Sequence, residues 1–259
     1  MRFAKMLTAA ASAGVVVLVG TVGPAVAETA TYVVRNPQLK DGYPDTPSAT
    51  DVNWYREDTR PGGTTTLTKE FGAPTGLGDG SLKLTTDNTD NAKAQAITYH
   101  RVRDTVLATV TNLSYWTYQS LAAGGTDQSG PSLQLRVDID GNLATTADVT
   151  NLVYEPYWND TEGPAPQQPL APDTWQFWNA TDGQWWSTKR IECLLFVVEP
   201  GAGGPPFTTP FDVGTNCVGS RVIAFGVNAG TFNRNYIVGA DGLHFQTAAD
   251  DFTWDAGPK

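Results

Sequence analysis

Residues 132–140 constrain the fold more than any other segment, because apolar and polar residues alternate there without a break. Every second residue from Leu133 to Ile139 is apolar, and polar residues stand between them. Successive side chains of a β-strand point to opposite faces, so this spacing predicts a strand with one buried and one polar face. The following Asp140-Gly141-Asn142 predicts a turn.

The rest of the chain repeats this pattern in shorter pieces. Segments rich in β-branched and aromatic residues alternate with clusters of Gly, Pro, Asn and Asp, and none has a sustained helical period. The sequence therefore predicts an all-β fold, an antiparallel β-sandwich of jelly-roll type. The other expected strands are 31–35, 64–71, 81–86, 94–100, 113–118, 149–155, 175–179, 185–189, 194–199, 220–227, 235–239, 243–246 and 252–254.

The first residues have the pattern of a targeting segment. Arg2 and Lys5 precede an apolar run rich in small residues, and Ala25-Val26-Ala27 ends it. This is typical of a secretory signal peptide over residues 1–27. We therefore expect a secreted, extracellular protein with a single β-sandwich domain over 28–259 and no membrane association after cleavage.

Charge and cysteine content limit the classes of partner. The formal net charge is −10, with 27 acidic and 17 basic residues. An acidic chain offers no basic stripe for phosphates, which argues against nucleic acid and anionic membranes as partners. The two cysteines, Cys193 and Cys217, are expected to pair in an exported protein.

Residues 152–191 hold five of the eight tryptophans. Such rings either fill the space between two sheets or form a platform for the apolar faces of sugars. The period of a strand puts Trp185 and Trp186 on opposite faces, and puts Trp175 and Phe177 on one face with Trp178 on the other. The candidate ligand-binding residues are Tyr154, Tyr157, Trp158, Trp175, Trp178, Trp185 and Trp186, with the amides Gln176 and Gln184.

Three short motifs connect the chain to a known group. They are the glycine turn and strand 78–84, the Leu-Ser-Tyr-Trp-Thr-Tyr segment 113–118, and the late Val-Gly-Ala-Asp-Gly-Leu segment 238–243. In this order they resemble the galactose-binding-like jelly-roll domains of bacterial secreted proteins, which include carbohydrate-binding modules of glycoside hydrolases. The resemblance implies a polysaccharide or glycan partner and a structural calcium ion held by Asp241.

Other acidic residues and the histidines give further candidates. Asp138 and Asp140 would share a face of a strand and could bind a hard cation, although a solvated strand that ends in an Asp-Gly turn is the favoured interpretation. Glu155 is the acid to test first for glycoside hydrolysis, which usually needs two carboxylates. Only His100 and His244 offer a base for serine hydrolase chemistry, and the sequence has no zinc-binding motif.

These observations favour a non-catalytic module that binds carbohydrate, or another surface, through exposed aromatic residues. No catalytic residue is assigned. Two alternatives stay open at this point. One is a glycoside hydrolase or polysaccharide lyase of the same sandwich fold, and the other is a structural secreted domain with every large ring buried.

Overall fold

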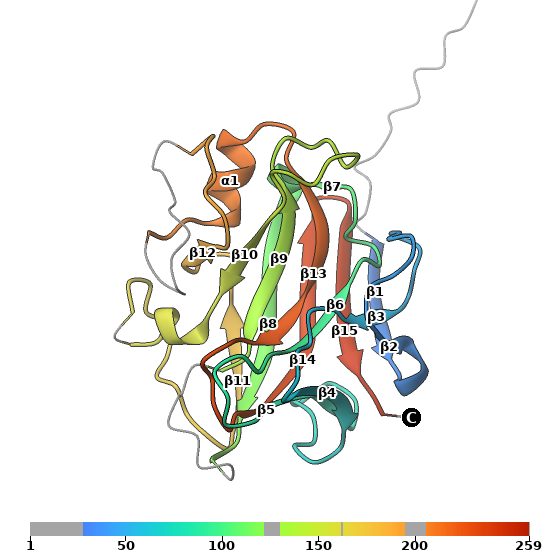
Figure 1. The fold of residues 1–259 in the computed structure, drawn as a ribbon, viewed down its shortest axis with the longest axis vertical. Coiled ribbons are helices and arrows are strands. Elements are labelled where there is room, and N and C mark those ends of the chain that lie inside the picture. Colours follow the sequence, from blue (N-terminus) through green and yellow to red (C-terminus); the bar gives the residue numbers. More distant parts are fainter. Residues whose placement is uncertain (1–27, 122–129, 162, 195–205, 259) are drawn as a thin grey trace, which may run out of the picture.

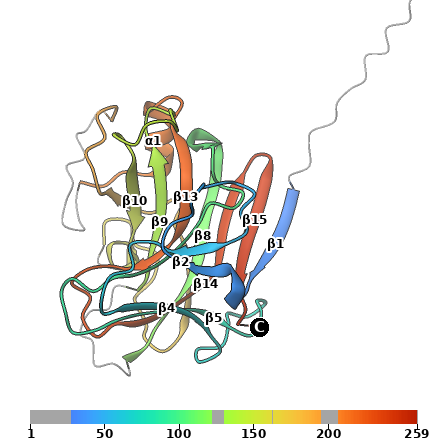
Figure 2. The same ribbon diagram turned by 45° about the vertical axis from the view of Figure 1, so that its right-hand side comes forward.

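The computed structural model describes residues 28–121, 130–161, 163–194 and 206–258. Two β-sheets pack face to face, with β9, β10 and β13 in one layer and β14, β15 and β1 in the other (Figures 1 and 2). The expected segment 1–27 and most of the expected strand 194–199 lie outside the described residues.

One sheet, called sheet A below, is built around β14. The strand β8 pairs with β14 on one side, while β5 and β15 pair with successive parts of its other side. The outer strands β11, β4 and β1 complete the sheet. Its strands are β1 (Glu28–Val34), β4 (Gly63–Thr68), β5 (Ser81–Thr86), β8 (Val110–Gln119), β11 (Trp175–Asn179), β14 (Ile237–Thr247) and β15 (Asp250–Ala256).

The other sheet, sheet B, has the order β12-β10-β9-β13-β6-β3-β2, with β7 paired to β13. The alternating segment forms β9 as expected, at the centre of this sheet. Its strands are β2 (Leu39–Asp41), β3 (Trp54–Arg56), β6 (Ala94–Thr98), β7 (Thr105–Val106), β9 (Ser132–Asp138), β10 (Thr150–Tyr154), β12 (Trp185–Ser187) and β13 (Arg221–Ala229).

Helical structure is short. The helix α1 (Pro210–Asn216) begins with Thr209 as its N-cap, whose side chain accepts a hydrogen bond from the Asp212 backbone N–H. Among the described residues, 3-10 turns span Asn36–Gln38, Leu107–Thr109 and Pro156–Asn159. Within the described part of the chain, no helix has the length and apolar character needed to span a membrane.

The all-β sandwich is confirmed, with two differences in detail. Both sheets are mixed, because β1 pairs with β15 and β2 pairs with β3 in parallel. The expected strands 235–239 and 243–246 form one strand, β14, whose register shifts near Gly242, a residue with a positive φ of 54°. A bulge of this kind lets the strand continue through an apparent turn signal. The disulfide Cys193–Cys217 forms as expected.

The core lies between the sheets and is rich in aromatic rings. Phe225 of sheet B contacts Phe245 and Trp254 of sheet A, with ring centroids 5.7 and 5.8 Å apart. Trp54 of β3 meets Trp254 edge-on at 6.2 Å. Trp54 therefore fixes the long polar N-terminal loop to the body of the protein, and the inward residues of β9 pack into the same cluster.

Neighbouring residues of β11 give a direct test of this core. The Trp178 side chain is fully buried, whereas Phe177 on the opposite face is 45% exposed. We expect Trp178→Ala to lower the free energy of unfolding by about 3–5 kcal/mol. Phe177→Ala should cost less than about 1 kcal/mol. Denaturant unfolding of both variants measures this, and similar losses for the two would contradict the assignment of faces.

Candidate functional site

The tryptophan-rich segment does not form one surface. The strand β11 joins sheet A by pairing with β8, whereas β10 and β12 pair with each other in sheet B. Trp175 and Trp186 therefore lie on the two opposite outer faces of the sandwich. The candidate rings are therefore distributed over these two faces and the core, and they do not form one platform.

Three of the expected ligand-binding rings are core residues, which corrects the prediction for them. Tyr154, Trp178 and Trp185 are fully buried. The indole N–H of Trp178 donates to Thr117 Oγ1 at 2.9 Å, and that of Trp185 donates to the Ala180 carbonyl at 2.7 Å. These hydrogen bonds satisfy the polar edges of both rings inside the protein, so neither ring is available to a ligand.

Trp175 belongs to an aromatic strip on the outer face of sheet A. Its ring lies 5.5 Å from that of Tyr118, which stacks on Phe71 at 4.7 Å. Its N–H donates to the Phe71 carbonyl. The amide of Gln176 bonds to the backbone of Pro169 and Ala171 and so holds the proline-rich loop. Gln176 therefore has a structural role here.

The remaining candidates lie near the start of β12 and in the preceding turn. Tyr157 is exposed and Trp158 is partly buried, and their rings meet edge-on at 4.9 Å. The Gln184 backbone N–H donates to Asn159 Oδ1 at 2.8 Å, which joins this turn to β12. These three residues do not line either of the two cavities described below.

Trp186 lines a groove of 440 Å³ on the outer face of sheet B. Cross-strand pairing places Trp186 beside Val153, and Val153 beside Gln134. The groove thus crosses β12, β10 and β9 and reaches β13. The residues that line it are Arg60, Lys93, Gln134, Asn151, Val153, Glu155, Trp186, Thr188, Asn228, Gly230, Thr231, Phe232 and Asn233.

The far side of this groove carries a second ring. Phe232 lies in the loop after β13 and is 69% exposed. Its φ is +70°, and its backbone N–H donates to the Asp90 carbonyl at 2.9 Å. A bulky residue with positive φ is unusual, and the surrounding contacts hold it there. Two rings, Trp186 and Phe232, therefore flank the groove on opposite sides of β9.

The floor of the groove is polar. The side chains of Gln134 and Asn228 are almost completely buried, and the Gln134 Oε1 and Asn228 Oδ1 atoms have no hydrogen-bond partner among the described residues. Buried amide oxygens normally have a partner, because an unsatisfied one costs about 1–3 kcal/mol.

The two cations near the groove share one acid. Lys93 Nζ lies 2.7 Å from Asp58 Oδ2, and Arg60 Nε lies 3.1 Å from Asp58 Oδ1. Burial lowers the pKa of Lys93, while its contact with Asp58 opposes that effect. Asp58 therefore offsets part of the positive charge of this wall and holds both cations in ion pairs.

Glu155 is the acidic residue that lines the groove. Burial raises the pKa of its carboxyl to about 7, against the opposing effect of nearby Trp186, Trp158 and Ser132. A carboxyl with this pKa is part protonated near neutral pH. It can therefore donate or accept a hydrogen bond at the groove.

A buried ion pair lies beside the groove, on the outward side of β9, and holds one of the groove's side chains in place. Arg136 of β9 donates through Nη1 to Glu57 Oε2 at 2.8 Å and to the Tyr99 hydroxyl at 3.0 Å. Its Nε donates to Asn151 Oδ1, and Asn151 lines the groove. Glu57 is fully buried, so removal of Arg136 would leave an unpaired charge there.

Asp241 has a structural role through Oδ1, while its Oδ2 has no hydrogen-bond partner among the described residues, and the expectation that it holds a metal ion stays a prediction. It is fully buried, and its Oδ1 accepts from the backbone N–H groups of Gly242 and Ala256, both at 2.8 Å. Burial raises its pKa to about 7. Asp241 therefore joins β14 to the end of β15. The described residues place one group of three ligand-bearing side chains together, and it is elsewhere: Asp138, Asp140 and Asp148.

The histidines are held by their neighbours. His244 lies with Nε2 2.7 Å from Asp251 Oδ1 and Nδ1 3.3 Å from Ser114 Oγ. The order resembles a serine hydrolase triad, but Ser114 is 4% exposed, so a substrate cannot reach its hydroxyl. His100 is buried and packs edge-on against Tyr32 at 4.6 Å, and burial lowers its pKa.

Sequence reasoning missed most of the groove. Gln134 lies at an outward position of an expected strand, where a polar residue normally indicates solvent, and Asn228 lies just after the expected strand 220–227, which the structure extends to Ala229. Phe232 lies in a loop, where an isolated aromatic residue carries no pattern. The one available signal was Trp186 together with Glu155, because both were candidates and strand pairing brings them to the same face.

The sequence matches no known family and no curated protein. Two solved structures resemble the chain. One is a family 11 carbohydrate-binding module from Clostridium thermocellum in complex with a β-1,3-1,4-mixed-linked tetrasaccharide, at 8% identity and a TM-score of 0.38, with 74% of this chain and 87% of that chain covered. The other is the family 11 module of a cellulosomal cellulase from the same organism, at 9% identity and a TM-score of 0.37, with 73% and 85% covered.

The pKa of Glu155 gives a prediction for stability. A carboxyl whose pKa rises from 4.5 to about 7 on folding binds its proton more tightly in the folded state. The free energy of unfolding should therefore fall as pH rises from about 4.5 to about 7. Glu155→Gln should remove part of this fall, up to about 3 kcal/mol for the full shift.

Chemical denaturation at a series of pH values measures the effect. Asp241 titrates in the same range in both proteins, so its contribution cancels in the difference. The exposed Glu70→Gln serves as the matched control and should leave the profile of the wild type unchanged. Parallel profiles for wild type and Glu155→Gln would contradict the raised pKa.

Proposed function

We propose that the protein is a secreted carbohydrate-binding module and that a neutral polysaccharide binds in the groove on the outer face of sheet B. The observation that carries the proposal is the composition of this groove. Two rings flank a floor of amide groups whose oxygens have no partner among the described residues. Ligand sites commonly combine apolar walls with a few convergent polar groups.

Each part of the groove has a role in this proposal. The partly exposed face of Trp186 stacks on the apolar face of a sugar ring, and Phe232 contacts a second ring across β9. The sugar hydroxyls form hydrogen bonds with the more accessible polar side chains of the groove, among them Asn151 and Thr188. Asp58 offsets part of the charge of Arg60 and Lys93, which reduces their attraction for an anionic glycan.

Secretion is supported by two sequence features. The first 27 residues have the order of charged, apolar and small residues that is typical of a signal peptide. The disulfide Cys193–Cys217 is suited to an oxidising compartment. The partner is thus an extracellular polysaccharide.

Substitution of Trp186 tests the site. Trp186→Ala should weaken binding at least about tenfold, equivalent to about 1.4 kcal/mol, because the stacking surface is lost. Trp175→Ala is the matched control, since it removes the same side chain from the opposite face of the sandwich. Affinity electrophoresis against neutral plant, fungal and bacterial polysaccharides identifies the ligand, and calorimetry measures the change.

Two outcomes would reject the site. One is that the wild type binds none of these polysaccharides. The other is that Trp175→Ala loses affinity while Trp186→Ala keeps it, which would place the ligand on the aromatic strip of sheet A. Equal melting temperatures for the two variants and the wild type exclude a loss of folding as the cause.

Glycoside hydrolysis is the second candidate, favoured by Glu155 alone. A pKa of about 7 is typical of a general acid that must be protonated before it acts. Hydrolysis usually needs a partner carboxylate at a set distance. Release of reducing sugar by the wild type, lost in Glu155→Gln while binding persists, would favour the enzyme over the binding module.

A further inference from the structure

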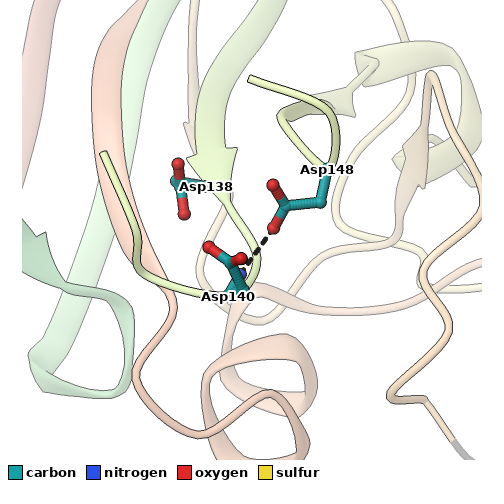
Figure 3. Close-up of side chains that lie close together, drawn as sticks. All are labelled: Asp138, Asp140 and Asp148. Atoms are coloured by element: carbon teal, nitrogen blue, oxygen red, sulfur yellow. Dashed lines mark hydrogen bonds between the residues drawn. The ribbon is translucent and has the colours of Figure 1, made fainter. Parts of the chain in front are cut away.

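A second polar site lies at the C-terminal end of β9, away from the groove. The loop 139–149 leaves β9 and folds back before β10 begins, which brings Asp148 beside Asp138 and Asp140. Figure 3 shows the three carboxylates facing a common space. One ligand oxygen from each of them lies within 4.8 Å of the others.

Of these three residues, Asp138 is the one whose buried carboxylate lacks hydrogen-bond partners in the described part of the chain. It is 0% exposed, and neither of its carboxylate oxygens has a hydrogen-bond partner among the described residues. Its cross-strand neighbour Arg221 directs its Nη1 to Asp104 Oδ1 instead, at 2.7 Å. A buried carboxylate without a donor or a cation is strongly unfavourable.

The two other carboxylates are oriented by the backbone of the loop. Asp148 Oδ2 accepts from the Asp140 N–H at 2.6 Å, shown as the dashed line in Figure 3, and Asp140 Oδ1 accepts from the Asn142 N–H at 2.7 Å. Each carboxylate thus has one oxygen held by the protein and one left for a ligand. This arrangement fixes their directions before any ion binds.

Glycine at position 141 is required for this turn. Gly141 has a φ of +75°, and a Cβ atom there would lie 2.2 Å from the Gly219 carbonyl oxygen. The turn therefore packs directly against the segment that follows α1. Only glycine allows this close approach, and the approach holds Asp140 against the end of β9.

Charge at this site is unbalanced within the described residues. None of the ion pairs among them includes Asp138, Asp140 or Asp148. Burial, followed by repulsion from Asp148 and Asp140, raises the pKa of Asp138. An adjoining hollow of 580 Å³ is lined by Asp140 and Asp148, by the disulfide, and by the C-terminal end of α1. It gives room for water molecules beside the carboxylates.

We propose that Asp138, Asp140 and Asp148 bind a calcium ion. Oxygen donors alone favour a hard cation, and the group contains no histidine or cysteine that would favour zinc. Calcium accepts six to eight oxygen ligands in flexible geometry, so three carboxylates and water from the hollow suit it. Magnesium needs a near-ideal octahedron and gives up its water reluctantly, which this loop suits less well.

The proposal does not depend on carbohydrate binding. The ion joins the loop 139–149 to β9, next to the disulfide and α1, while the proposed sugar groove crosses the middle of sheet B. Calcium thus stabilises one end of the sandwich. This calcium site is separate from the one expected at Asp241, which stays a prediction.

The test uses the full protein after treatment with a chelator. Addition of calcium chloride should raise the melting temperature by several degrees and give a saturable heat in calorimetry, with a Kd of about 10⁻⁴–10⁻³ M as in extracellular modules. Asp138→Asn should weaken this binding at least tenfold. The exposed Asp45→Asn is the matched control and should respond to calcium as the wild type does.

We expect Asp138→Asn to fold, because the substitution removes a buried charge that has no partner among the described residues. Without calcium it should therefore melt at or above the temperature of the metal-free wild type. Two results would overturn the proposal. One is that calcium neither stabilises the wild type nor gives heat, and the other is that Asp138→Asn binds calcium as tightly as the wild type.

Discussion

The apolar layer between the two sheets is the constraint on which the rest of the structure depends. Phe225, Phe245 and Trp254 meet across it, and the inward residues of β9 pack into the same cluster. Burial of such rings is the main source of folding energy in a sandwich of this size. Because every inward position is committed to the core, the outward positions of the same strands are free to carry polar and functional groups.

This division explains how one strand serves three purposes. The side chains of β9 that point inward fill the core. Those that point outward are Gln134 in the groove, Arg136 in the buried ion pair with Glu57, and Asp138 at the carboxylate cluster. A slip of one residue in register would exchange the two sets and bring one amide and two charged side chains into the core, so the core fixes the positions of all three groups together.

Sequence reasoning recovered what is local. Alternation predicted β9, and strand period placed Trp185 and Trp186 on opposite faces; the structure shows Trp185 inward and Trp186 outward. The segments 81–86 and 175–179 form strands with the expected bounds. These features depend on the direction of neighbouring side chains, which the backbone of a strand determines.

Features that depend on distant pairing were not predictable. Nothing near Trp175 in the sequence indicates that β11 pairs with β8 while β12 pairs with β10, so the tryptophans were treated as one group of candidates. The position of Asp148 beside Asp138 depends on how the connection 139–149 folds back, and the position of Phe232 depends on a contact with Asp90. Strand order and loop closure are decided by packing across the whole chain.

The parallel pairing of β1 with β15 has a consequence for how the molecule is assembled. Glu28 pairs with Asp250 and Val34 with Ala256, so the earliest strand in the described chain has its partner at the far end of the sequence. During synthesis β1 therefore stays without this partner until residues 250–256 have been made. Contacts of such long separation slow folding, and until they form, an open strand edge is available to other chains. Removal of either terminal strand would leave that edge permanently open.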